Sequence, residues 1–189
     1  MKKAFTIVEL LVVVGILGIL LTMVFVSAKG SLADARDRRA DALCQAVQSG
    51  LASYHVLYDE WPEPLAGKVR SGSFNDSNEE GEDNRTDPEK YVLKADEVRK
   101  MVKALVDEAK KGNPLMDVSG LFVSRDSGEP DTRGTGYDFT EAVRGSNRNR
   151  KRMSTGEMFF GYPDRSTGFF RRFKMVYSVP GDSLTVSKQ

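Results

Sequence analysis

The sequence predicts an α+β protein in which one long N-terminal helix, membrane-spanning in its first half, packs on a small antiparallel sheet, with a second helix in the head. Three observations predict this fold. An apolar run opens the chain at residues 5–28. No proline occurs before Pro62, so the helix can continue beyond the apolar run. The C-terminal part alternates apolar and polar residues with the period of a β-strand.

The apolar run at residues 5–28 contains Glu9 as its only ionisable side chain. A helix of this length rises about 36 Å, enough to cross a hydrocarbon core of ~30 Å. Lys2 and Lys3 precede the run, and positive charge on a short flank keeps that end of a protein in the cytoplasm. We therefore expect a single-pass protein with the bulk of the chain on the far side of the membrane.

Three interpretations of this N-terminus differ in how they treat Glu9. A secretory signal peptide would be cut after Ala28, but the run is longer than the usual core of ~7–15 residues and contains a carboxylate. A plain anchor leaves Glu9 unexplained, because a charge in a span costs at least ~2.5 kcal/mol. A cut between Ala4 and Phe5 would create an α-amino group that Glu9 can neutralise, within one helix or between subunits. We favour this third interpretation, which makes Glu9 a filament-assembly contact.

The segment "KKAFTIVELLVVVGILGILL" resembles the class III signal of type IV pilins and type II secretion pseudopilins. The resemblance lies in the basic leader, the cut before Phe5, Thr6, and Glu9 inside an apolar run. It implies that a prepilin peptidase removes the leader and methylates the N-terminus of Phe5. The family usually has glycine before the cut, where this chain has Ala4, which is also small. The pair Trp61-Pro62 is similar to the aromatic-proline pair that often follows the long helix in pseudopilins.

This resemblance implies a pilin-like fold and a structural role rather than an enzymatic one. The expected partners are other copies and other pseudopilins in a helical filament, the prepilin peptidase and an inner-membrane assembly platform. The head is then periplasmic and the N-terminus cytoplasmic. Cys44 is the only cysteine, so the head lacks the cysteine pair of many type IV pilins, which favours type II secretion. Two alternatives stay open: a minor pilin whose basic loop binds DNA or a surface, and a secreted protein cut after Ala28.

The expected organisation has four parts. They are a leader at residues 1–4, the transmembrane half of the long helix at 5–28, its periplasmic half at 29–61, and an αβ head at 62–189 with polar loops at 71–89 and 125–156. The periplasmic half has an apolar stripe at helical spacing, made of Leu43, Val47, Leu51, Tyr54 and Tyr58. Trp61-Pro62 ends the helix, and we expect Trp61 to cap the core of the head. Gly30 is either a bend or a tolerated exposed glycine.

The head is expected to contain a second helix at residues 94–112 and strands at its C-terminal end. The apolar face of that helix comprises Val98, Met101, Val102, Leu105, Val106 and Ala109. Residues 120–124 form a short strand, residues 157–163 and 169–179 form a hairpin around Gly168, and residues 182–188 add an edge strand. In the second hairpin strand, one face is apolar with Arg171 as the exception, and comprises Phe169, Phe173, Met175, Tyr177 and Val179. The other face comprises Phe170, Arg172, Lys174, Val176 and Ser178.

No catalytic constellation is apparent in the sequence, and we expect no enzyme. His55 is the only histidine, and on one helix it lies ~16 Å from Cys44, too far for a Cys-His dyad. Packing roles are expected for both.

Two charged segments have open roles. Residues 76–89 contain seven acids, which suit a solvated loop or a calcium site, although the spacing matches no EF-hand; we expect no other cofactor. Residues 144–152 form a basic cluster, which suits a polyanion site, a solvated loop, or a loop that faces the acidic segment of the same or a neighbouring head. The net charge of +1 indicates no polyanionic partner, so we do not expect nucleic acid.

Overall fold

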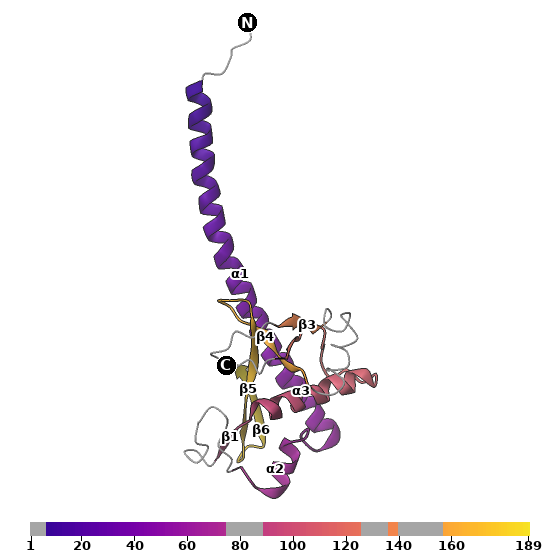
Figure 1. Cartoon of the computed structure of the whole chain (residues 1–189). Helices are drawn as coiled ribbons and strands as arrows, with labels where there is room; N and C mark the ends of the chain where they lie inside the picture. The colour runs from indigo at the N-terminus through magenta and orange to yellow at the C-terminus, as the bar shows by residue number, and fades with distance from the viewer. Residues whose placement is uncertain (1–6, 75–88, 126–135, 140–156) are drawn as a thin grey trace.

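A single long helix dominates the computed structural model, which describes residues 7–74, 89–125, 136–139 and 157–189 (Figure 1). Helix α1 runs over Ile7–Tyr58, 52 residues, and is therefore about 78 Å long. Its first half projects away from the head, and its second half packs into it. The helix passes through Gly30 without interruption, and Gly30 is exposed. The predicted continuous helix is confirmed over the described residues, although it ends at Tyr58, three residues before the end of the expected periplasmic half at residue 61.

The second half of α1 buries one stripe of side chains against the head. Leu43, Val47 and Leu51 are buried as predicted. Tyr58 departs from the predicted stripe, because its ring is exposed while its hydroxyl donates a hydrogen bond of 2.6 Å to Glu108 Oε2. Gly50 lies in the stripe because the neighbours leave little room: a Cβ there would lie 3.2 Å from Leu105 Cδ1. The long helix thus closely approaches the helix of the head that contains Leu105.

The segment after α1 contains a short helix that the sequence analysis did not predict. Trp61 is buried, as expected of a residue that caps the core. Helix α2 then covers Leu65–Ser71 and ends at Gly72, whose φ of 65° places it in the left-handed region that suits glycine. A helix of seven residues is too short for a periodic signal, and its stability comes from packing Leu65 and Ala66 into the core. Ser71, the first residue of the expected polar loop, therefore belongs to a helix.

Helix α3, Ala95–Lys110, is the predicted second helix. Most of its predicted apolar face is buried, from Val98 to Val106. At its start, Glu97 Oε2 accepts hydrogen bonds from the backbone N–H of Lys94 at 2.8 Å and from the hydroxyl of Tyr91 at 2.7 Å. The side chain of Glu97 therefore caps α3 and joins it to the sheet.

Within the described residues, the sheet has six strands and every strand pairing in it is antiparallel. The strands are β1 (Lys90–Val92), β2 (Phe122–Ser124), β3 (Tyr137–Asp138), β4 (Phe159–Pro163), β5 (Phe170–Ser178) and β6 (Ser183–Lys188). One path runs in the order β1-β5-β4-β2-β3, and β6 pairs with β5 off this path, opposite β1 along residues 176–178. The β4–β5 hairpin and the edge strand β6 confirm the predictions. The three-residue β1 and the two-residue β3 were not predicted.

The burial of β5 corrects the predicted division of its two faces. Phe173, like its neighbours on the same face, is buried as expected, but Phe169 and Val179 are each 38% exposed because they flank the strand. Phe170 and Arg172, assigned to the other face, are 0% and 6% exposed. Phe170 lies against the Gly136 backbone, where a Cβ would come within 2.7 Å of the Phe170 Cβ. The first half of β5 is therefore covered on both faces.

The core lies between the helices and the sheet. Helix α1 contacts β4, β6 and α3, while α3 contacts β4 and β5 as well as α1. Because β5 runs away from the exposed half of α1 and β6 returns, the β5–β6 turn lies near the C-terminal end of α1 (Figure 1). This topology creates two features with functional potential, one at each end of the long helix.

Candidate functional site: the exposed half of the long helix and a pocket at its far end

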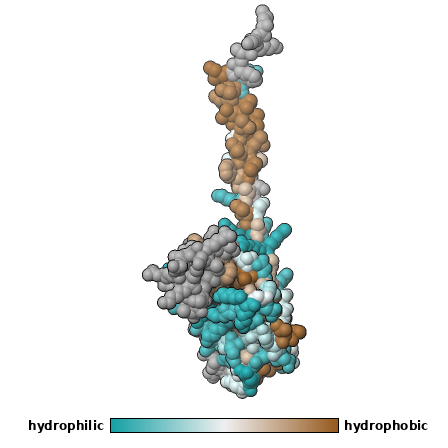
Figure 2. Space-filling view, turned by 90° about the vertical axis from the view of Figure 1, so that its right-hand side faces the viewer, coloured by the Kyte–Doolittle hydropathy of each residue, from teal (hydrophilic) through white to brown (hydrophobic). Residues whose placement is uncertain are grey.

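The first half of α1 presents an apolar surface that no other part of the structure covers. Every large apolar side chain from Ile7 to Phe25 is at least 48% exposed. Figure 2 shows this half as a continuous apolar column above a largely hydrophilic head. Among the described residues, α1 is the one helix long and apolar enough to cross a membrane, by length and composition. Such a surface requires a lipid or protein partner.

Two polar side chains, those of Thr22 and Glu9, lie in this apolar column. Thr22 Oγ1 donates a hydrogen bond of 2.7 Å to the carbonyl of Ile19, so its hydroxyl is satisfied within the helix. Glu9 lies in the first turn of α1 and is exposed. Ala4 and Phe5 lie outside the described residues, so the cut between them and the methylation of Phe5 stay predictions.

Charged side chains tie the head to α1 just beyond the apolar column. Arg165, in the β4–β5 turn, pairs with Asp34 at 2.8 Å. Lys188, at the end of β6, pairs with Asp37 at 2.6 Å and with Asp41 at 2.8 Å. The hydrogen bond from Lys188 lowers the pKa of Asp37. These exposed or partly buried pairs each contribute little energy, but together they place the head at a defined height on the helix.

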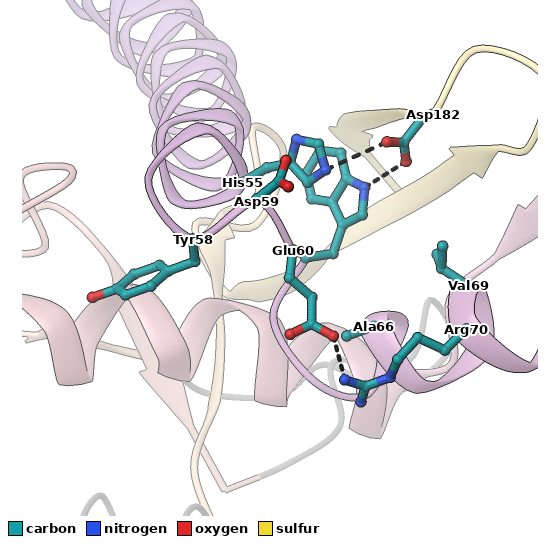
Figure 3. Close-up of a pocket in the computed structure, with 9 residues that line it drawn as sticks. His55, Tyr58, Asp59, Glu60, Ala66, Val69, Arg70 and Asp182 are labelled. Atoms are coloured by element: carbon teal, nitrogen blue, oxygen red, sulfur yellow. Dashed lines mark hydrogen bonds and ion pairs between the residues drawn. The ribbon is translucent and has the colours of Figure 1, made fainter.

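A hydrogen-bonded cluster around Asp182 joins the β5–β6 turn to the far end of α1 (Figure 3). Asp182 Oδ1 accepts hydrogen bonds from Trp61 Nε1 at 2.7 Å and from the Tyr177 hydroxyl at 2.8 Å. His55 Nε2 lies 3.4 Å from Asp182 Oδ2, and the His55 ring stacks on Trp61 with centroids 4.3 Å apart. The hydrogen bond from Trp61, helped by Tyr177 and by the charge of His55, lowers the pKa of Asp182.

A pocket of about 340 Å³ opens beside this cluster. It is lined by His55, Tyr58, Asp59, Glu60, Trp61, Ala66, Val69, Arg70 and Asp182. Arg70 forms ion pairs with Glu60 and Glu63 at its edge. The sequence analysis did not predict this pocket, because Trp61 and Asp182 are separated by 121 positions in the chain.

Cys44 and His55, the only cysteine and the only histidine of the sequence, lie in different surroundings. Cys44 is buried in the core, where burial raises its pKa to about 11 and keeps the thiol protonated. His55 lies at the pocket and packs on Trp61, which agrees with the packing role expected for it. Among the described residues, no group of three His, Cys, Asp or Glu side chains could hold a metal ion. The basic cluster at 144–152, and all of the acidic segment except Glu89, lie outside the described residues, so a calcium site there stays untested.

Comparison with known protein families concerns the exposed apolar half of α1 and the residues that precede it. Residues 1–25 match the family described as the prokaryotic N-terminal methylation motif. The chain carries a prepilin-type signal. The resemblance to type IV pilins and pseudopilins is thereby confirmed for this part of the chain, and the motif supports a type IV pilin-like or pseudopilin subunit. It implies processing by a prepilin peptidase and assembly into pilus-like filaments. No curated protein and no solved structure matches the chain.

The prepilin-type signal and the structure agree with one another. One long helix, with an antiparallel sheet and a second helix in the head, is the pilin-like α+β fold expected. The motif at residues 1–25 and the single long apolar helix fit a membrane-anchored, single-pass protein.

Proposed function

We propose that the chain is a pseudopilin, a structural subunit of a type II secretion-type or type IV pilus-type filament, with no catalytic role. A prepilin peptidase cuts between Ala4 and Phe5 and methylates Phe5. The mature chain is anchored in the inner membrane with its head in the periplasm, and it then joins the filament through α1. The observation that carries this proposal is the methylation motif placed at the start of an apolar half-helix that the head leaves uncovered.

The exposed column explains why extraction from the membrane has to be coupled to assembly into the filament. Each large apolar side chain that moves from a nonpolar environment into water costs roughly 1.5–3 kcal/mol. The column from Ile7 to Phe25 consists almost entirely of such side chains, so its exposure to water costs tens of kcal/mol in this estimate. Packing among the same half-helices of neighbouring subunits removes that cost. The head, which folds around the other half of α1, remains on the outside.

Glu9 supplies specificity that apolar packing lacks. Apolar helices can slide past one another, since each register buries a similar area. The carboxylate of Glu9 and the α-amino group of Phe5 can neutralise one another between neighbouring subunits, which favours one axial register. The cut before Phe5 is what creates this amine, so processing and assembly are coupled.

The decisive experiment is N-terminal sequencing of the protein purified from a host with an active prepilin peptidase. N-methylated Phe5 as the first residue supports the proposal. Lys29 as the first residue instead indicates a secreted protein cut after Ala28. Retention of Met1 leaves the plain membrane anchor. Deletion of the gene then separates the two kinds of filament, because loss of protein export indicates a secretion system and loss of surface fibres indicates a pilus. The single Cys44 favours the secretion system.

A further inference from the structure

We propose that the pocket at the far end of α1 binds a lysine or arginine side chain from the basic segment 144–152 of a second copy of this chain. The inference rests on the proposed function only for the meeting of two copies. The chemistry of the pocket itself comes from described residues, and four features support a cationic occupant.

The first feature is the charge of the pocket. Three carboxylates line it, from Asp59, Glu60 and Asp182, against the guanidinium of Arg70 and the imidazole of His55. Arg70 is already shared between Glu60 and the neighbouring Glu63. Asp182 is engaged by Trp61, Tyr177 and His55. The pocket therefore carries an excess of negative charge, and Asp59 supplies the carboxylate that these interactions leave available.

The second feature is the end of α1 itself. The last carbonyl groups of a helix lack intrahelical partners and form the negative end of its dipole, which favours a cation. His55 is the basic residue in the last turn of α1, which has neither lysine nor arginine there. Asp59 follows directly, with a φ of 54°. Glycine or asparagine usually occupies such a left-handed position after a helix, so aspartate adds a second negative charge where a neutral residue would suffice.

The third feature is the shape and the wall of the pocket. A volume of about 340 Å³ lies at the small end of the ~300–1,000 Å³ range of ligand sites, which suits one long side chain. Figure 3 shows His55 on one side and the α2 residues Ala66 and Val69 on the other. The ring of Trp61, which also lines the pocket, stacks on His55. These surfaces can pack against the methylene stem of a lysine or arginine while its charged end meets Asp59.

The fourth feature is charge complementarity within the sequence. Residues 144–152 carry five basic side chains, from Arg144, Arg148, Arg150, Lys151 and Arg152, and no acid. In a filament built from copies of this chain, every subunit that neighbours a pocket carries this segment in its sequence. Opposite charges on two surfaces that meet repeatedly speed association and select one relative orientation.

The test measures binding of a fluorescent synthetic peptide of residues 143–153 to the full-length protein in detergent micelles, by fluorescence anisotropy. We expect saturable binding that weakens as salt is added. Asp59→Asn should weaken it about fivefold, near the upper limit for one exposed charge pair, because asparagine keeps the left-handed backbone and removes the charge. Val69→Trp should abolish it by filling the pocket.

Two matched controls separate the pocket from general electrostatic attraction. Asp34→Asn removes the same charge about 38 Å away along α1 and should leave binding unchanged. A peptide with glutamine at its five basic positions should not bind. Equal affinities for Asp59→Asn and Asp34→Asn, or no binding to the unmodified protein, would overturn the inference. Because the assay requires neither the cut nor a filament, failure here with Phe5 as the mature N-terminus removes this inference and leaves the proposed function intact.

Discussion

Removal of the Asp182 carboxylate should destabilise the head more than removal of any exposed acid on α1. Asp182 accepts hydrogen bonds from Trp61 Nε1 and the Tyr177 hydroxyl. The residues Trp61 and Tyr177 are only 6% and 2% exposed. In Asp182→Ala both donors lose their acceptor, and the β5–β6 turn loses its attachment to the end of α1. Alanine is also less favourable than aspartate at the φ of 40° that residue 182 adopts, which adds to the loss.

The size of the effect follows from these contacts. A hydrogen bond to a charged group contributes about 1.5–3 kcal/mol, so two give roughly 3–6 kcal/mol. The Asp182 side chain is 52% exposed, so water can satisfy part of the lost bonding. We therefore expect the free energy of unfolding to fall by about 2–4 kcal/mol. For a domain of this size that lowers the melting temperature by roughly 5–12 °C.

The assay is thermal unfolding of the full-length protein in micelles, followed by tryptophan fluorescence. Trp61 is the only tryptophan, so the signal reports directly on this cluster. Asp34→Ala is the matched control, because it removes an exposed carboxylate paired with Arg165 and should cost less than ~1 kcal/mol. Equal melting temperatures for the Asp182→Ala and Asp34→Ala proteins would refute the reasoning.

The same cluster has a predictable pH dependence. The hydrogen bond from Trp61 lowers the pKa of Asp182 in the folded state. A lowered carboxyl pKa stabilises the fold above the ordinary value of about 3.9, and this contribution is lost as the pH falls through the folded value. The difference in melting temperature between the unmodified protein and Asp182→Ala should therefore shrink below about pH 4. A constant difference down to pH 2 would contradict the assigned cause.

The remaining predictions concern the core, the anchor and the processing site. Leu51→Ala should lower the free energy of unfolding by about 3–5 kcal/mol, since Leu51 is fully buried, and a loss below ~1 kcal/mol in the same assay would argue against its place in the core. Glu9→Ala should remain in the membrane but be missing from sheared filaments, and normal filament incorporation would exclude the amine-carboxylate account. Ala4→Val should accumulate as precursor on immunoblots while Ala4→Gly matures at least as fast as the native chain; normal maturation of Ala4→Val would count against processing at this site. The head from Asp34 onward should fold alone, and a circular dichroism spectrum of random coil would contradict this.

Local sequence signals determined the largest elements of this protein. The apolar run and the absence of proline before Pro62 predicted one long helix, and α1 is continuous over 52 residues. The helical spacing from Val98 to Val106 predicted α3, and the alternation around Gly168 predicted the β4–β5 hairpin. The prepilin-type signal in residues 1–25 is likewise contained in one short stretch of sequence. Each of these patterns repeats within a few residues, so a short window of sequence contains the whole physical cause.

Only the tertiary structure decided the features that depend on contacts between distant segments. The short helix α2 and the strand β3 have too few residues for a period, and packing or pairing with other parts of the chain holds them in place. The burial of Phe170 follows from the segment at Gly136 that covers it. The pocket requires Asp182 to meet Trp61 across 121 positions. Such a meeting results from the folding of the whole chain, since the free energy of a long-range contact depends on every element that brings its two partners together.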